Sequence, residues 1–320
     1  MLSRIKLMTP YFSVVIPLYN KAQEISETIS SVLAQTFTNF EVIIVNDGST
    51  DDSLNKVEKF NDQRIRIFTT QNKGVSHARN YGIQHATSQF IAFLDGDDIW
   101  KPHHLQDLKS LIESYPNCGL YCKAYNKIKG QTIIDSQYKD LPKHKKWSGV
   151  IDDYFYHSSI NSLASSSSIA INKSVFESIG FFNEAYDSGE DTDLWIRIAL
   201  QFPTAFDNNV SVTHNLNANH QLTNSLFSGR QHFNLNAFKN DELKNLSLKT
   251  YLDLNRYAIA IQYKLEKEFA TSKTIYKSID VRNLSRPQKL IYKCPIFVIK
   301  SMLSFRDILR LSHINLRLFR

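Results

Sequence analysis

The sequence predicts an α/β fold in which a mainly parallel sheet is flanked by helices and followed by a helical, basic region. Three observations carry this prediction. Strand-like apolar runs alternate with helix-like amphipathic runs over the first hundred residues. The strand-like runs are apolar at successive positions, as is typical of parallel strands buried on both faces. The excess of positive charge is confined to the last quarter of the chain.

The elements follow one another as strand, helix, strand, helix, strand, helix and strand. The expected strands are Ser13–Ile16, Phe40–Val45, Arg64–Phe68 and Phe90–Leu94. The expected helices between them are Lys21–Gln35, Asp51–Phe60 and Val75–Ala86. Repeated units of this kind build a Rossmann-like sheet. No G-x-G-x-x-G follows the first strand and no G-x-x-x-x-G-K-[ST] occurs, so the sequence lacks both the dinucleotide fingerprint and the phosphate loop.

The chain has 320 residues, of which 42% are hydrophobic, enough for one large α/β domain and an appendage. We expect the α/β domain to occupy residues 1–240 and the helical region residues 241–320. The latter carries 16 Lys and Arg against seven Asp and Glu, a net charge of +9, which leaves −2 for the first 240 residues. No basic and aromatic cluster of the kind that binds nucleic acid occurs in the first half.

Three features favour a cytoplasmic location. The three cysteines have no paired zinc spacing and an odd count, which favours a reducing compartment. The first residues do not form a signal-peptide pattern, and no run of 18 uncharged apolar residues occurs. We therefore expect neither secretion nor a membrane-spanning helix.

Polar residues follow three of the expected strands, where parallel strands present their carboxyl ends at one edge of a sheet. They are Pro17-Leu18-Tyr19-Asn20, Asn46-Asp47-Gly48 and Asp95-Gly96-Asp97-Asp98. The last cluster of carboxylates repels itself unless a cation such as Mg²⁺ or Mn²⁺ neutralises it. Asp47 can accept a hydrogen bond from a uracil or guanine ring N–H, and Tyr19 offers a stacking face. The alternatives are helix-capping and turn aspartates and a packing tyrosine.

Four segments, taken in order, resemble the successive motifs of the family 2 glycosyltransferases, which have the GT-A fold. They are Ser13–Lys21, Phe40–Asp51, Lys73–Gly82 and Phe93–Asp98. The resemblance implies an inverting enzyme that moves a sugar from a nucleotide-diphosphate donor, usually a UDP-sugar, to a hydroxyl group. It also implies that Asp47 contacts the base, Asp95 the ribose and Asp97 the Mn²⁺ or Mg²⁺ that bridges the diphosphate.

The same motifs contain Pro17, Tyr19 and Arg79, which the resemblance places at the nucleotide sugar. For Arg79 the alternative is a salt bridge on the surface of a helix. Two histidines, His214 and His220, lie in a region where related enzymes offer a histidine to the diphosphate or metal. Neither aligns with a motif, so we expect both to be structural residues.

A second acidic pair, in Gly189–Arg197, resembles the segment in which this family places its catalytic base. An acceptor hydroxyl is a poor nucleophile, so a carboxylate must accept its proton as the new bond forms. Asp191 is the expected base and Glu190 the second choice. The alternative is that acidic residues in the first turn only stabilise the helix dipole, by about 0.3–1 kcal/mol each.

The sequence therefore predicts a metal-dependent glycosyltransferase that builds a bacterial surface polysaccharide or lipid-linked glycan. It has neither the Q-x-x-R-W motif nor the membrane spans of processive synthases, so we expect it to add one sugar or a few. A nucleotidyltransferase is the alternative enzyme, but it needs a glycine-rich, basic triphosphate loop after the first strand. A non-catalytic carbohydrate-binding protein on a GT-A fold is the other alternative, and the intact acidic residues argue against it.

The last forty residues predict a contact with an anionic membrane. Residues 281–320 contain nine Lys and Arg and one acid, Asp307, interleaved with apolar residues. An apolar stripe flanked by cations suits a helix lying on a membrane, so we expect a peripheral protein on the inner face of the plasma membrane. Alternatively, the stripe packs on the catalytic domain or on a second subunit in a homo-oligomer.

Overall fold

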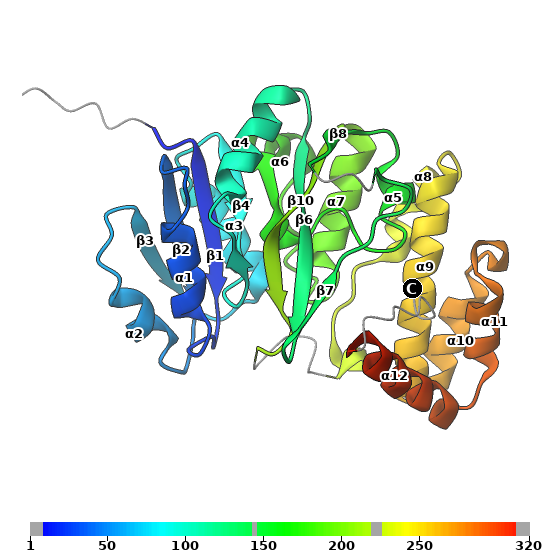
Figure 1. Ribbon diagram of the computed structural model, residues 1–320. Coiled ribbons are helices and arrows are strands. Elements are labelled where there is room, and N and C mark those ends of the chain that lie inside the picture. The colour runs from blue at the N-terminus through cyan, green and yellow to red at the C-terminus, as the bar shows by residue number, and fades with distance from the viewer. Residues whose placement is uncertain (1–8, 143–145, 219–225, 312–320) are drawn as a thin grey trace, which may run out of the picture.

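The computed structural model describes residues 9–142, 146–218 and 226–311. It contains a ten-stranded sheet in the order β3-β2-β1-β4-β9-β6-β10-β5, with β7 paired to β6 and β8 to β10 (Figure 1). The first four strands are parallel, as predicted. They are β1 (Phe12–Leu18), β2 (Phe40–Asp47), β3 (Ile65–Thr70) and β4 (Phe90–Phe93). Their carboxyl ends therefore meet at one edge.

The second half of the sheet is mixed. β9 (Ile169–Asn172) runs antiparallel between β4 and β6 (Leu120–Lys129), and β10 (Thr204–Asn215) runs parallel to β6. The remaining short strands all pair antiparallel. They are β5 (Ile99–Trp100), β7 (Thr132–Asp135) and β8 (Ser148–Ile151). Because β6 and β10 point the same way as β1, their ends also reach the edge where β1 and β4 end.

Helices cover both faces of the sheet. They are α1 (Ile25–Leu33), α2 (Ser53–Glu58), α3 (Val75–His85), α4 (His104–Ser114), α5 (Tyr154–His157), α6 (Lys173–Ile179) and α7 (Glu190–Gln201). Successive strand residues face opposite sides. Val14 and Ile16 accordingly join the core under α1 and α4, whereas Val15 joins the core under α3, α6 and α7.

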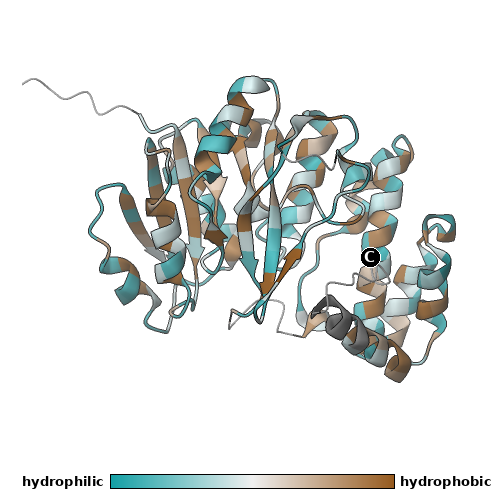
Figure 2. Cartoon of the chain, in the orientation of Figure 1, coloured by the Kyte–Doolittle hydropathy of each residue, from teal (hydrophilic) through white to brown (hydrophobic). Residues whose placement is uncertain are grey.

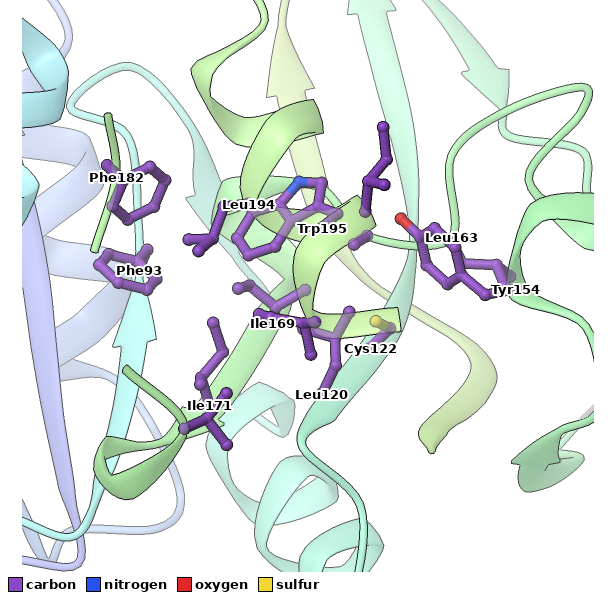
Figure 3. Packing of buried hydrophobic residues seen from close by; sticks show 14 of the residues in the cluster. Phe93, Leu120, Cys122, Tyr154, Leu163, Ile169, Ile171, Phe182, Leu194 and Trp195 are labelled. Atoms are coloured by element: carbon purple, nitrogen blue, oxygen red, sulfur yellow. The ribbon is translucent and has the colours of Figure 1, made fainter. Parts of the chain in front are cut away.

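Aromatic packing fixes the start of α7 against the end of β4. The ring of Phe182 lies edge-on to Phe93 at 5.5 Å and to Trp195 at 6.0 Å between ring centroids. Figure 3 shows Leu194 and Trp195 of α7 beside Ile169 of β9. The first turn of α7 is thereby held near the edge of the sheet where the strands end.

A helical region follows the sheet, as predicted. It comprises α8 (Lys239–Glu242), α9 (Leu246–Leu265), α10 (Phe269–Lys277), α11 (Arg286–Lys293) and α12 (Ile296–Leu311). Tyr251 in the first half of α9 belongs to the core of the sheet domain, whereas Tyr257 in its second half belongs to a separate cluster with Ile291 and Ile299. Helix α9 therefore joins the two parts of the molecule.

The apolar stripe of the last two helices is divided between core and surface. Ile291 and Ile299 are buried in the separate cluster, with Met302 packed against it. Leu290 and Phe297 remain 64% and 71% exposed. Figure 2 shows hydrophobic and hydrophilic residues alternating along these helices. No helix within the described ranges is long and apolar enough to cross a membrane.

Candidate active site

A pocket of about 1110 Å³ opens at the edge where β1, β2 and β4 end. All eight site residues proposed from the sequence line it. They are Pro17, Tyr19, Asp47, Arg79, Asp95, Asp97, Glu190 and Asp191. These residues come from segments up to 174 positions apart, so only the parallel topology and the docking of α7 bring them together.

Asp47 ends β2 and is 3% exposed. Its carboxylate accepts hydrogen bonds from the backbone N–H groups of Lys73 (3.0 Å) and Gly74 (2.8 Å) and from the hydroxyl of Thr70 (3.1 Å). Asp47 thus holds the loop that leads into α3. The turn role considered from the sequence is present, and contact with a base stays a prediction.

Arg79 on α3 is 4% exposed and connects β4 to α7. Its Nη2 donates to Asp95 Oδ1 at 2.8 Å, and its Nη1 donates to Glu190 Oε1 at 3.0 Å. Burial alone would lower the pKa of Arg79, but the Asp95 and Glu190 carboxylates outweigh it and the pKa is raised. Arg79 is therefore a buried cation between two acids, not a surface salt-bridge partner.

Asp97 and Asp98 have different partners. Asp97 Oδ2 accepts from Lys21 Nζ at 2.7 Å, and burial together with the charge of Asp98 raises the pKa of Asp97 to about 6. The Asp98 carboxylate accepts from Ser167 Oγ at 2.6 Å and lies 2.5 Å from His214 Nδ1. Although burial acts to raise the pKa of Asp98, His214 and Ser167 lower it overall.

His214, which we expected from the sequence to be a structural residue, lines the pocket. Its Nδ1 faces Asp98, and its Nε2 lies 2.9 Å from Ser165 Oγ. The Asp98 carboxylate can only accept when ionised, so His214 Nδ1 carries the proton in this contact. The partners are 116 residues apart, so nothing local in the sequence indicates this pair. His220 lies outside the described residues.

The acidic pair opens α7 after Gly189, whose φ of +79° is favourable only for glycine. Glu190 is 9% exposed, and burial and Asp191 raise its pKa to about 7 despite the neighbouring Arg79. Asp191 is half-buried and accepts from the backbone N–H and hydroxyl of Thr192 through Oδ1. Asp193 is 7% exposed and pairs with Arg197 at 2.8 Å, one turn further along the helix.

A divalent ion fits this pocket if the substrate supplies most of its ligands. The described ranges hold no group of three or more His, Cys, Asp and Glu side chains that could bind a metal ion. Asp95 is paired with Arg79, and Asp98 with His214 and Ser167. Asp97, whose Oδ2 accepts from Lys21 Nζ, also lies on the pocket wall. One carboxylate with phosphate oxygens and water is a coordination that Mg²⁺ accepts.

Comparison with known families identifies the chain. Residues 13–179 match the family model described as glycosyl transferase family 2. The chain belongs to this family. The chain is 27% identical to an uncharacterized glycosyltransferase of Haemophilus influenzae over 288 residues. The match covers 85% of this chain and 87% of that protein.

Other relatives match over shorter parts. An uncharacterized glycosyltransferase of Rickettsia felis is 30% identical over 214 residues, 65% of this chain, and the match spans 34% of its own length. The Escherichia coli protein WfgD is named as a UDP-Glc:alpha-D-GlcNAc-diphosphoundecaprenol beta-1,3-glucosyltransferase. It is 44% identical over 95 residues, which cover 29% of this chain and 38% of WfgD.

A solved structure confirms the GT-A fold of this family 2 protein. Staphylococcus aureus TarS 1-349 in complex with UDP-GlcNAc superposes with a TM-score of 0.58 at 19% identity. The match covers 89% of this chain and 76% of that one. The similarity therefore extends beyond the family motifs into part of the helical region.

Proposed function

We propose that this chain is an inverting glycosyltransferase that moves a sugar from a UDP-sugar to a hydroxyl of a glycan or lipid-linked acceptor. The observation that carries the proposal is that a half-buried carboxylate, Asp191, lines the same pocket as the acidic cluster at the end of β4. A donor in this pocket has its diphosphate at Asp97 and Lys21 and its nucleotide toward Asp47 and Tyr19.

In this proposal each side chain of the pocket has a separate role. Asp191 accepts the proton of the acceptor hydroxyl while the hydroxyl oxygen attacks the anomeric carbon on the side opposite the diphosphate. The bond from that carbon to the diphosphate oxygen breaks, UDP leaves with the bonding electrons, and the configuration of the carbon is inverted. Arg79 fixes Glu190 and Asp95 and so keeps the base and donor sites at a constant separation. Asp97 would hold the Mn²⁺ or Mg²⁺, and the bound ion would supply positive charge to offset the negative charge on the departing diphosphate.

Ligand stabilisation tests the donor class. Thermal unfolding should be followed with a panel of nucleotide sugars in Mn²⁺ and in chelator. The correct donor at 100 times its dissociation constant adds about 2.7 kcal/mol to the free energy of unfolding. Stabilisation by nucleoside triphosphates, with release of pyrophosphate, would instead identify a nucleotidyltransferase.

We further propose that the acceptor is lipid-linked and that the protein works on the inner face of the plasma membrane. Helix α12 lies at the same end of the molecule as the carboxyl ends of β1 and β6, where the pocket opens (Figure 1). Residues 286–304 contain four Lys and Arg and no acid. The exposed Leu290 and Phe297 lie among these cations. A membrane bound there would bring its lipids toward the pocket mouth.

A further inference from the structure

The ammonium group of Lys21 lies beside Asp97, the carboxylate that we propose binds the metal ion. Lys21 Nζ lies 2.7 Å from Asp97 Oδ2, and each side chain is 13% exposed. Both residues line the pocket. The contact is therefore inside the proposed diphosphate site and is shielded from the screening that weakens a surface pair.

The backbone of Lys21 is fixed while its side chain is long enough to move. The backbone N–H donates to Ser53 Oγ at 2.8 Å, and the carbonyl accepts from Ile25 N–H at 2.9 Å as α1 begins. The ammonium sits on a flexible four-carbon stem, which can turn between Asp97 and another anion in the pocket.

The neighbouring carboxylates cannot take the place of Asp97 as partner. Asp95 is paired with the buried Arg79, and Asp98 accepts from His214 and Ser167. A divalent ion bound to Asp97 would lie within a few ångströms of the Lys21 ammonium, and the two positive charges would repel each other.

We propose that Lys21 competes with the metal for Asp97. It holds the carboxylate while the pocket is empty and turns to the donor diphosphate when donor and metal bind together. The inference rests on the proposed metal role of Asp97. The competition predicts that the metal ion binds weakly to the empty pocket. Binding of the nucleotide diphosphate should then increase the affinity for the metal ion.

Metal binding without turnover tests the proposal. Free Mn²⁺ is measured by electron paramagnetic resonance with the full chain, first without nucleotide. Lys21→Met should bind Mn²⁺ about tenfold more tightly than wild type, because one competing charge is gone. Adding UDP should reduce the difference in Mn²⁺ affinity between Lys21→Met and wild type, because Lys21 then has the diphosphate as a second anionic partner.

Matched variants separate competition from a general change of charge. Lys21→Arg keeps a cation at the position and should keep the weak wild-type affinity. Lys56→Met removes one charge from neighbouring α2, where Nζ donates to the Ala22 carbonyl, and should also match wild type. Lys21→Met combined with Asp97→Asn should lose the added affinity. Thermal unfolding checks that each variant is folded.

Three results would overturn the inference in distinguishable ways. Equal Mn²⁺ affinity in wild type and Lys21→Met, with binding still lost in Asp97→Asn, would exclude Lys21 as competitor and leave Asp97 as the metal ligand. Absence of Mn²⁺ binding in every variant, with and without UDP, would reject the metal role of Asp97 together with the competition. If UDP does not change the ratio of Mn²⁺ affinities between Lys21→Met and wild type, the Lys21 side chain does not turn to the diphosphate.

Discussion

Asp191 and Glu190 are adjacent in the chain but have different surroundings. Glu190 is bound by Arg79, whereas Asp191 is half-buried on the pocket wall. Asp191→Asn keeps the shape but cannot accept a proton, so we expect turnover to fall about 10²–10⁴-fold with donor affinity nearly unchanged. Glu190→Gln is the matched control and should lose less turnover. A larger loss of turnover in Glu190→Gln would identify Glu190, not Asp191, as the catalytic base.

The raised pKa of Glu190 predicts a pH dependence of stability. Burial and Asp191 raise this pKa from 4.5 to about 7. The folded chain therefore holds the proton more tightly than the unfolded chain, so the free energy of unfolding falls as pH rises from 4.5 to about 7. Asp97, with a pKa raised to about 6, acts in the same direction.

Replacing Glu190 isolates its share of this effect. Urea unfolding at pH 5 and pH 7.5 should show a decrease in wild type that is about 2 kcal/mol larger than in Glu190→Gln. The glutamine has no proton to release, so its own decrease reflects the remaining groups. Parallel pH dependences in the two proteins would contradict the raised pKa.

At the scale of elements, Gly189 sets the start of α7. A Cβ at this residue would lie 2.4 Å from Phe233 Cδ1, and its φ of +79° already disfavours other residues. Gly189→Ala should lower the free energy of unfolding by about 2–4 kcal/mol and reduce turnover, because Asp191 moves with the first turn. Urea unfolding and a turnover assay measure both effects.

Gly130→Ala is the control for backbone strain alone. Gly130 has a φ of +60°, and a Cβ there meets nothing within 4 Å. It should cost about 1 kcal/mol and leave turnover intact. Equal losses in the two variants would mean that the contact with Phe233 does not position α7.

The sequence predicted the elements whose residues repeat a local pattern. Four parallel strands and the polar loops after them follow from apolar runs and from the rule that such ends meet. The short strands β5, β7 and β8 were not predicted, because two to four residues carry too little pattern. Their antiparallel pairing depends on tertiary packing.

Pairs that form across the fold were also beyond prediction from the sequence. Lys21 and Asp97 are 76 residues apart, and His214 and Asp98 are 116 apart. Each residue alone suits a helix start or a strand end. Their partnership arises only when β1, β4 and β10 end at one edge, so the chemistry of the site was predicted by residue type and its contacts were not.

At the scale of the whole molecule, we predict binding to anionic membranes. Phe297→Ser and Leu290→Ser should each weaken sedimentation with phosphatidylglycerol vesicles severalfold, because each removes an exposed apolar side chain beside cations. Leu246→Ser is the control: Leu246 is 81% exposed at the start of α9, at the opposite end of the molecule from α12 (Figure 1).

Two outcomes would reject the membrane surface. One is equal vesicle binding by all three variants and the wild type. The other is a shift from dimer to monomer in Phe297→Ser, seen by analytical ultracentrifugation, with no vesicle binding by the wild type. That result would assign the surface to a second copy of the chain.

The most direct test of the proposed function is a transfer assay with the products identified. Wild type, with Mn²⁺ and a panel of UDP-sugars, is incubated with a lipid-diphosphate-linked sugar, and the acceptor is followed by mass spectrometry and anomeric NMR. We predict a mass increase of one sugar, an inverted anomeric configuration and loss of product in Asp97→Asn. Retained configuration, or full product formation by Asp97→Asn in chelator, would contradict the proposed mechanism.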